Sequence, residues 1–190
     1  MSISEGNSKL GKIPNVSLVP IADCGNCSQC SRKCYALKAY RMYKTTRQSW
    51  DMNSHLAHTE PETYFSMIDQ YLAKKEPTLF RWHVAGDILD QNYVDQMVEL
   101  AQKYPQTKFL AFTKMHELDY SAAPSNLSIV ASRWPGDSLQ PTTDLRQAWM
   151  QDGTETRVPE NTLECSGSCS TCNACWDLKA LNKDVLFNIH

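Results

Sequence analysis

The eight cysteines of this 190-residue chain stand in two short groups near its opposite ends. The first group has the spacing C-x2-C-x2-C-x3-C, and the second has the mirror-image spacing, C-x3-C-x2-C-x2-C. Their members are Cys24, Cys27, Cys30 and Cys34, and then Cys165, Cys169, Cys172 and Cys175. No cysteine lies between the two groups, so the intervening residues must fold in a way that leaves both groups free to bind a ligand.

The spacing of the first group is the one by which bacterial ferredoxins hold cubane iron-sulfur clusters. A short loop with closely spaced thiolates can wrap one cube and present a sulfur to each of several irons. Structural zinc prefers two C-x2-C pairs separated by a longer loop. Three cysteines separated by consecutive two-residue gaps fit that pattern poorly. We therefore predict that all eight cysteines are metal ligands, with two [4Fe-4S] clusters as the simplest content and zinc as the alternative metal.

Disulfide bonds are a third interpretation of the same cysteines. The sequence begins MSISEGNSKL, which has neither the basic segment nor the apolar segment of a secretory signal. We therefore expect a reducing cytoplasm, in which thiolates stay available for metal.

Composition narrows the fold and the partners. A chain of 190 residues that is 42% hydrophobic can bury one sizeable core, which predicts a single domain over residues 1–190 with cysteine loops at 24–34 and 165–175. Nineteen basic and 21 acidic side chains give a formal charge of -2, without a long run of either sign, so nucleic acid is not the expected partner. No apolar stretch approaches the length that spans a bilayer, so no membrane contact is expected.

Two helices are predicted in the first half of the chain. The segment 34–58 carries a loose helical stripe of apolar residues, and Thr59, Pro61 and Glu62 form a capping signal for a second helix that ends before Pro77. The basic residues near the first cysteine loop are Arg32, Lys33, Lys38, Arg41, Lys44 and Arg47. They form either a solvated helix face, a compensating charge for a thiolate-rich cluster, or a docking surface for an acidic partner.

A strand-helix-strand pattern over residues 79–131 gives the clearest tertiary prediction. Strands are expected at 79–84, 108–112 and 127–131, a helix at 93–104 with Asp90 as its N-cap, and a last strand at 185–189. Repeated alternation of strand and helix implies an α/β fold with a parallel sheet. We predict that this sheet is a partial barrel of TIM-like type.

Polar residues cluster where the predicted strands end. In a parallel sheet the carboxyl ends of the strands border one crevice, so side chains there are candidate ligands of a cofactor or substrate. The predicted cofactor-binding residues are His83, Gly86, Asp87, Lys114 and Arg133. Each has a structural alternative: Asp87 as a helix cap, Lys114 as a solvated side chain, and His83 as a core histidine. The sequence assigns no catalytic residue.

Four motifs resemble the phage gene product 88 family. They are KIPNVSL at 12–18, CSRKCYALK at 30–38, FRWHVAGD at 80–87 and CNACW at 172–176. The resemblance covers most of the chain and implies a phage or prophage origin. It therefore implies action in the cytoplasm of an infected bacterial host, with a redox, phage or host protein as partner, but it implies no activity.

A more distant resemblance is to radical S-adenosylmethionine enzymes, which combine a partial parallel barrel with a three-cysteine loop. Cys165, Cys169 and Cys172 match the C-x3-C-x2-C spacing of that loop, and residues 85–87 could stand where those enzymes hold the methionine amino group. The matching triplet, however, follows the sheet instead of preceding it, and Leu37 occupies the place of a third cysteine in the N-terminal run.

The leading functional hypothesis is a phage-type iron-sulfur protein that takes part in electron transfer or redox chemistry. An enzyme of radical S-adenosylmethionine type, with that molecule as a further cofactor, is the first alternative. A zinc-stabilised interaction protein of the phage is the second. The mirrored spacing also predicts that the two groups meet in space, with Cys34 serving the cluster of the second group and Cys165 that of the first.

Overall fold

Seven parallel strands form one sheet in the computed structural model, which describes residues 1–27, 30–138 and 144–188. The strands are β1 (Asn15–Val16), β2 (Leu79–Trp82), β3 (Lys108–Thr113), β4 (Leu127–Arg133), β5 (Arg146–Gln151), β6 (Thr162–Glu164) and β7 (Asp184–Asn188). Their order is β1-β2-β3-β4-β5-β7-β6, and every neighbouring pair is parallel. The α/β fold with a parallel sheet is thus confirmed, and the sheet is open, with β1 and β6 at its edges.

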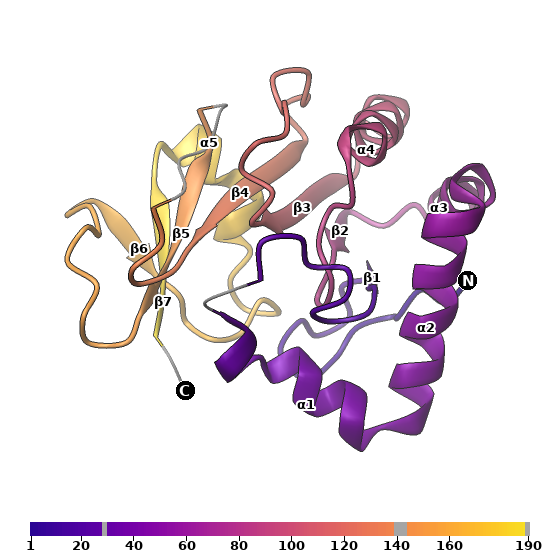
Figure 1. The fold of residues 1–190 in the computed structure, drawn as a ribbon. Coiled ribbons are helices and arrows are strands. Elements are labelled where there is room, and N and C mark those ends of the chain that lie inside the picture. The colour runs from indigo at the N-terminus through magenta and orange to yellow at the C-terminus, as the bar shows by residue number, and fades with distance from the viewer. Residues whose placement is uncertain (28–29, 139–143, 189–190) are drawn as a thin grey trace.

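The longer helices lie toward the β1 and β2 side of the sheet, and β6 and β7 lie toward the opposite side (Figure 1). The helices are α1 (Tyr35–Met42), α2 (Lys44–Thr59), α3 (Pro61–Lys75), α4 (Gln91–Lys103) and the short α5 (Leu178–Leu181), with 3-10 turns η1 (Cys30–Lys33) and η2 (Ala174–Asp177). No helix in the described part of the chain is both long and apolar enough to cross a bilayer.

The predicted strand-helix-strand unit is confirmed. β2 and β3 pair in parallel, with Leu79 opposite Lys108, and α4 connects them. The Asp90 side chain accepts a 2.8 Å hydrogen bond from the Tyr93 backbone N–H, which is the capping role expected from the sequence. The last strand, β7, covers most of the predicted 185–189 segment, of which Ile189 lies outside the described residues.

Two local predictions are wrong. The helix expected over 34–58 is divided into α1 and α2, because Tyr43 leaves helical geometry with φ -112° and ψ 108°. Thr59 does not cap α3: its hydroxyl donates to the His55 carbonyl within α2, and Glu60 takes the N-cap position ahead of Pro61. Thr59 therefore closes one helix, and proline at the first position starts the next.

Each face of the sheet is covered by a different part of the chain. Alternate strand residues such as Phe80, Trp82 and Phe109 pack against side chains from α2, α3 and α4 in the larger core cluster. Leu110 and Val130 point to the other face, where Trp176 and the segment around it cover them in a second cluster. A parallel sheet needs both faces covered, and here the C-terminal cysteine segment supplies the second cover.

The chain bends sharply after β2, where the site begins. His83 ends the strand with φ +52°, and the Leu18 N–H donates a 2.9 Å hydrogen bond to the Ala85 carbonyl, which joins the segment after β1 to this bend. Gly86 follows with φ +78°, and a Cβ placed on it would lie 2.6 Å from the Leu18 Cβ. The bend thus requires glycine for its backbone conformation and for the closeness of Leu18.

We expect Gly86→Ala to lower the free energy of unfolding by about 3 kcal/mol, because it adds overpacking against Leu18 to the cost of a positive φ. Gly136 is a matched control: its φ is +79°, yet a Cβ placed on it would have nothing within 4 Å. Gly136→Ala should cost only about 1 kcal/mol. Equilibrium urea unfolding of the anaerobic proteins measures both values, and equal losses would show that Leu18 packing does not matter.

Candidate metal centre

The first cysteine loop is tied to the carboxyl ends of β2 and β3. The Asp87 N–H donates a 2.7 Å hydrogen bond to the Asp23 carbonyl, and the Asn26 side chain donates a 3.0 Å hydrogen bond to the Lys114 carbonyl. The buried Asp23 carboxylate accepts from the Val19 N–H at 2.7 Å and lies 2.8 Å from His58 Nε2 on α2. These contacts hold Cys24 at the start of the loop against the strand ends.

Two thiols of the first group lie close together, and the other two receive hydrogen bonds from the backbone. The Sγ atoms of Cys27 and Cys30 lie 3.2 Å apart. Cys24 Sγ accepts from the Ile21 N–H at 3.3 Å, and Cys34 Sγ, at the N-cap of α1, accepts from the Leu37 N–H at 3.4 Å. Backbone N–H groups that point at sulfur stabilise thiolates, which are the form that binds metal.

The second cysteine loop connects β6 to η2 across the sheet face. The Cys165 N–H donates to the Leu186 carbonyl at 2.9 Å, and the Cys169 N–H donates to the Lys9 carbonyl at 2.9 Å. Cys165 Sγ accepts from the Gly167 N–H at 3.4 Å. The buried Trp176 follows, and its indole N–H donates a 3.2 Å hydrogen bond to the Phe80 carbonyl. The segment is thus fixed to β7 at one end and to β2 at the other.

Burial raises the pKa of several of these thiols. It raises the pKa of Cys24 to about 11 and that of Cys175 to about 12, with a smaller contribution in each case from other cysteines of the same group. Burial also raises the pKa of Cys27, and the adjacent Cys30 adds to the effect. In the metal-free chain these groups are therefore protonated thiols at neutral pH, and metal binding would displace their protons.

Tyr35 is influenced by cysteines of both groups. Its hydroxyl donates a 2.7 Å hydrogen bond to the Val84 carbonyl, although 66% of the residue is exposed to solvent. Enclosure of the hydroxyl end raises the pKa of Tyr35, and the charges that act on it include those of Cys34 and Cys169. One tyrosine hydroxyl is thus influenced by cysteines of both groups.

Arg81 is a positive charge that acts on this arrangement. It acts on Tyr35 and also on Cys169 and Cys175, where it opposes the rise in thiol pKa that burial causes. Its guanidinium stands 4.9 Å from the centre of the Phe112 ring. Its buried Nε has no hydrogen-bond partner among the described residues. A buried donor without an acceptor fits a site that takes an anionic group.

The donor set as a whole fits a sulfur-rich anionic cofactor: eight thiols, backbone N–H groups directed at sulfur, and one unsatisfied guanidinium N–H. Over residues 1–27, 30–138 and 144–188, no three side chains of His, Cys, Asp or Glu are arranged to hold a single metal ion.

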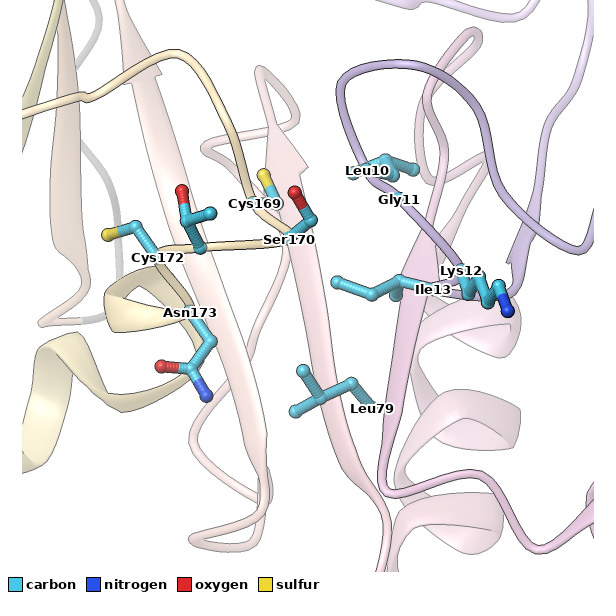
Figure 2. Close-up of a pocket in the computed structure, with 10 residues that line it drawn as sticks. Leu10, Gly11, Lys12, Ile13, Leu79, Cys169, Ser170, Cys172 and Asn173 are labelled. Atoms are coloured by element: carbon cyan, nitrogen blue, oxygen red, sulfur yellow. The ribbon is translucent and has the colours of Figure 1, made fainter.

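An open pocket of about 490 Å³ lies beside the second cysteine loop. Figure 2 shows Leu10, Ile13 and Leu79 on one side of it and the chain from Cys169 to Asn173 on the other. Leu10 and Ile13 are buried and belong to the same apolar cluster as Trp176, so one wall of the pocket is apolar. The N-terminal segment and the second cysteine loop therefore form its two walls.

Two of the predicted cofactor-binding residues, Asp87 and Lys114, are brought together at the first loop. The Asp87 carboxylate accepts from the Lys114 N–H at 2.8 Å and from the Ile88 N–H at 2.7 Å. Burial raises the pKa of Asp87 to about 6, against the effect of those hydrogen bonds, and its charge in turn acts on Cys24. The Lys114 ammonium lies 5.1 Å from the centre of the Trp134 ring, so it reaches toward the end of β4.

The other three predicted residues, His83, Gly86 and Arg133, make contacts that serve the fold. His83 is 3% exposed, and its Nε2 lies 2.9 Å from the Tyr93 hydroxyl in the helix-covered core, where burial lowers its pKa to about 3. Gly86 serves the bend against Leu18. Arg133 is buried and forms a 3.0 Å ion pair with Asp137. The structural alternative for His83, a neutral core histidine, therefore matches its surroundings.

Two residues of this site, Arg81 and Tyr35, were not predicted from the sequence. Arg81 is a charged residue between Phe80 and Trp82 in a strand that is otherwise apolar, and that contrast was the available signal. Tyr35 follows the last cysteine of the first group directly, but nothing in its local sequence shows that a cysteine of the second group also acts on it.

The buried Asp87 carboxylate generates a stability prediction. Asp87→Ala leaves the N–H groups of Ile88 and Lys114 without their acceptor, so we expect the free energy of unfolding to fall by about 2–4 kcal/mol. Glu99→Ala on the exposed face of α4 is the control and should change it by less than about 0.5 kcal/mol. Urea unfolding of the metal-free proteins at pH 7 measures both changes in unfolding free energy. An Asp87→Ala protein as stable as the native one would mean that other groups accept the hydrogen bonds of the two N–H donors.

Asp87 also sets the direction of a pH effect. Its pKa is about 6 in the folded protein and 3.8 in its ordinary state, so between these values the folded chain holds a proton that the unfolded chain releases. The stabilising contribution of the protonated carboxyl is present at low pH and is lost as the pH rises through about 6. The difference in unfolding free energy between the native protein and Asp87→Asn should therefore decrease by about 2–3 kcal/mol from about pH 4 to about pH 7. A constant difference would contradict this assignment.

Comparison with known proteins agrees with the motifs in the sequence. A family model described as gene product 88 matches residues 2–178 of this chain. No curated protein and no solved structure matches it. The matched region includes both cysteine groups, the bend after β2 and the tryptophan that fixes the second loop. The chain therefore belongs to the gene product 88 family.

Proposed function

We propose that this protein binds two [4Fe-4S] clusters and transfers electrons in the cytoplasm of a phage-infected bacterium. What supports the proposal is the presence of two four-cysteine groups, each with at least one sulfur that accepts a backbone hydrogen bond, together with one tyrosine, Tyr35, that is influenced by cysteines of both groups. Such clusters accept and release single electrons. Two clusters near each other suit transfer, because electrons pass readily only over short distances.

Each group would hold its own cluster. The thiols that act on Cys24 include Cys30 and Cys34, and those that act on Cys175 are Cys165, Cys169 and Cys172. These neighbours favour ligation within each group over the exchange of Cys34 and Cys165 that the mirrored sequence suggests. The backbone N–H groups at Cys24, Cys34 and Cys165 would then orient and stabilise the thiolate ligands.

Arg81 would tune the redox potential of the second cluster. Its charge acts on Cys169 and Cys175, and its buried Nε–H is free to donate toward sulfur. A nearby positive charge and hydrogen bonds to the sulfurs make reduction easier, so both effects raise the potential of an iron-sulfur cluster. Phe112 and the apolar cluster behind it would limit access of water to the same region.

Metal analysis of anaerobically reconstituted protein tests the proposal. We expect about eight iron and eight sulfide per chain, as two cubes require, with a brown colour and absorbance near 400 nm. The double variant Cys27→Ser with Cys30→Ser should retain about half of the iron, and so should Cys169→Ser with Cys172→Ser. Ser166→Ala, an exposed position in the second loop, is the control and should retain all of it.

Each other outcome of that analysis has a clear meaning. Zinc without sulfide would replace the proposal by the zinc-stabilised interaction protein. Four disulfides and no metal in the anaerobic protein would exclude both the iron-sulfur protein and the zinc-stabilised protein. A complete loss of iron in either double variant, with the fold intact by circular dichroism, would point to one larger cluster that is shared by the two groups.

A radical S-adenosylmethionine enzyme is the second candidate, and one observation favours it. The bend at residues 85–87 lies directly against the first cysteine loop, through the hydrogen bond from the Asp87 N–H to the Asp23 carbonyl. A partial-barrel curvature of the sheet would suit that chemistry, because it would enclose a substrate at the strand ends. Against it, the Asp87 carboxylate is buried and already accepts two backbone hydrogen bonds.

Titration calorimetry with S-adenosylmethionine separates the two candidates. An enzyme of that type should release heat on binding when its clusters are intact, and its spectrum should change, because one iron must lack a cysteine ligand. The electron-transfer protein should show neither effect, because cysteines would ligate all its irons.

A further inference from the structure

The positive charge of this chain is concentrated beside the first cysteine loop. Residues 24–50 contain six of the nineteen basic residues and none of the 21 acidic ones. The remaining 163 residues therefore carry thirteen basic and 21 acidic side chains, a formal charge of -8 against +6 for this segment. A chain whose net charge is only -2 thus has a strong internal separation of charge.

All six basic side chains are exposed to solvent. They are Arg32 and Lys33 on η1, Lys38 and Arg41 on α1, and Lys44 and Arg47 at the start of α2. No ion pair found among the described residues includes any of them. Their charge is therefore available to another molecule. We call these six residues, together with the apolar side chains among them, the α1 surface.

The α1 surface also carries exposed apolar side chains. Tyr35 is 66% exposed, Met42 is 61% exposed and Tyr43 is 57% exposed, and together they make up half of the large hydrophobic side chains exposed on the described structure. Tyrosine, methionine and arginine are the residue types enriched at the centres of protein interfaces. A surface that combines exposed apolar side chains with basic ones has the composition expected of one that recognises an acidic protein.

The α1 surface begins at the proposed cluster site. Cys34 is the N-cap of α1 and Cys30 starts η1, so Arg32 and Lys33 lie between two of the four thiols of the first group. Tyr40 stacks on Trp50 with ring centres 6.2 Å apart and its hydroxyl donates to Asp51, which fixes α1 to α2. A partner bound here would stand over the first cluster on a rigid support.

We infer that the α1 surface is the docking site of a small acidic electron-carrier protein, which exchanges electrons with the first cluster. This inference rests on the proposed electron-transfer function and names its partner. Complementary charge would steer such a carrier to the surface, and the weak, salt-sensitive contact that results would let it leave after one electron has passed. The strong negative charge over the rest of the chain would repel the carrier elsewhere.

Binding of a purified oxidised flavodoxin, measured by titration calorimetry at about 50 and about 300 mM NaCl, tests the inference. We expect an affinity that weakens roughly tenfold or more with added salt. Lys38→Glu with Arg41→Glu should weaken binding at low salt by a similar factor and remove most of the salt dependence. Met42→Ala should weaken binding roughly threefold at both salt concentrations, because it removes only apolar contact.

The matched control is Lys74→Glu with Lys179→Glu, which changes the net charge equally at exposed sites on α3 and α5. It should leave affinity within about twofold of the native value. Equal losses in both double variants would attribute binding to net charge and overturn the inference. So would the absence of flavodoxin binding. Tight binding of a single-stranded oligonucleotide, lost in Lys38→Glu with Arg41→Glu, would instead identify a nucleic-acid surface.

Iron and sulfide analysis of the same samples separates this inference from the function beneath it. Protein with full clusters and no affinity for flavodoxin would contradict the docking site alone. Protein without clusters would contradict the proposed function, whatever it binds.

Discussion

The position of the candidate metal centre depends on the parallel direction of the strands. Because the seven strands of the described residues all run the same way, their carboxyl ends gather at one edge of the sheet. The first cysteine loop is held at that edge by hydrogen bonds to the ends of β2 and β3, through Asp87 and Lys114. Strands of alternating direction would leave the loop without two adjacent ends to bind.

Two buried carboxylates fix the first loop to this edge of the sheet. Asp23 and Asp87 are both nearly inaccessible to solvent. The Asp23 carboxylate accepts a hydrogen bond from one backbone N–H, and the Asp87 carboxylate accepts from two. The two residues are also joined directly, because the Asp87 N–H donates to the Asp23 carbonyl. A buried carboxylate is costly unless such donors surround it. The start of the loop is therefore positioned by hydrogen bonds within the protein itself, without a cofactor.

The sequence predicted the parts of the fold that depend on local pattern. The segment from β2 to β3 has apolar strands and an amphipathic helix with a strong N-cap, so periodicity and capping were sufficient. β1 has two residues and β6 has three, and strands this short exist only through pairing with a neighbour already in place. The break at Tyr43 also lacks a proline or glycine that would mark it.

In the candidate site, too, the residues marked by a local pattern were predicted and those placed by distant contacts were not. The two cysteine groups were evident from spacing, and placing residues at strand ends brought Asp87 and Lys114 together correctly. The same reasoning gave no way to see that His83 turns into the core, since that depends on a positive φ at one residue and on Tyr93 across the interface. Likewise Arg81 gains its importance from a segment about 90 positions later in the sequence, which no local pattern reports.

The second cysteine loop and the residues that follow it also form the cover of one face of the sheet. Trp176 and Leu178 are buried there, between the loop and the start of β7. If the loop holds a cofactor, its loading and the burial of that face become a single event, because a metal site rarely forms in an unfolded chain. A newly made chain without iron would then leave apolar strand residues accessible to proteases and chaperones, so the lifetime of the protein in the cell would follow the supply of iron and sulfide.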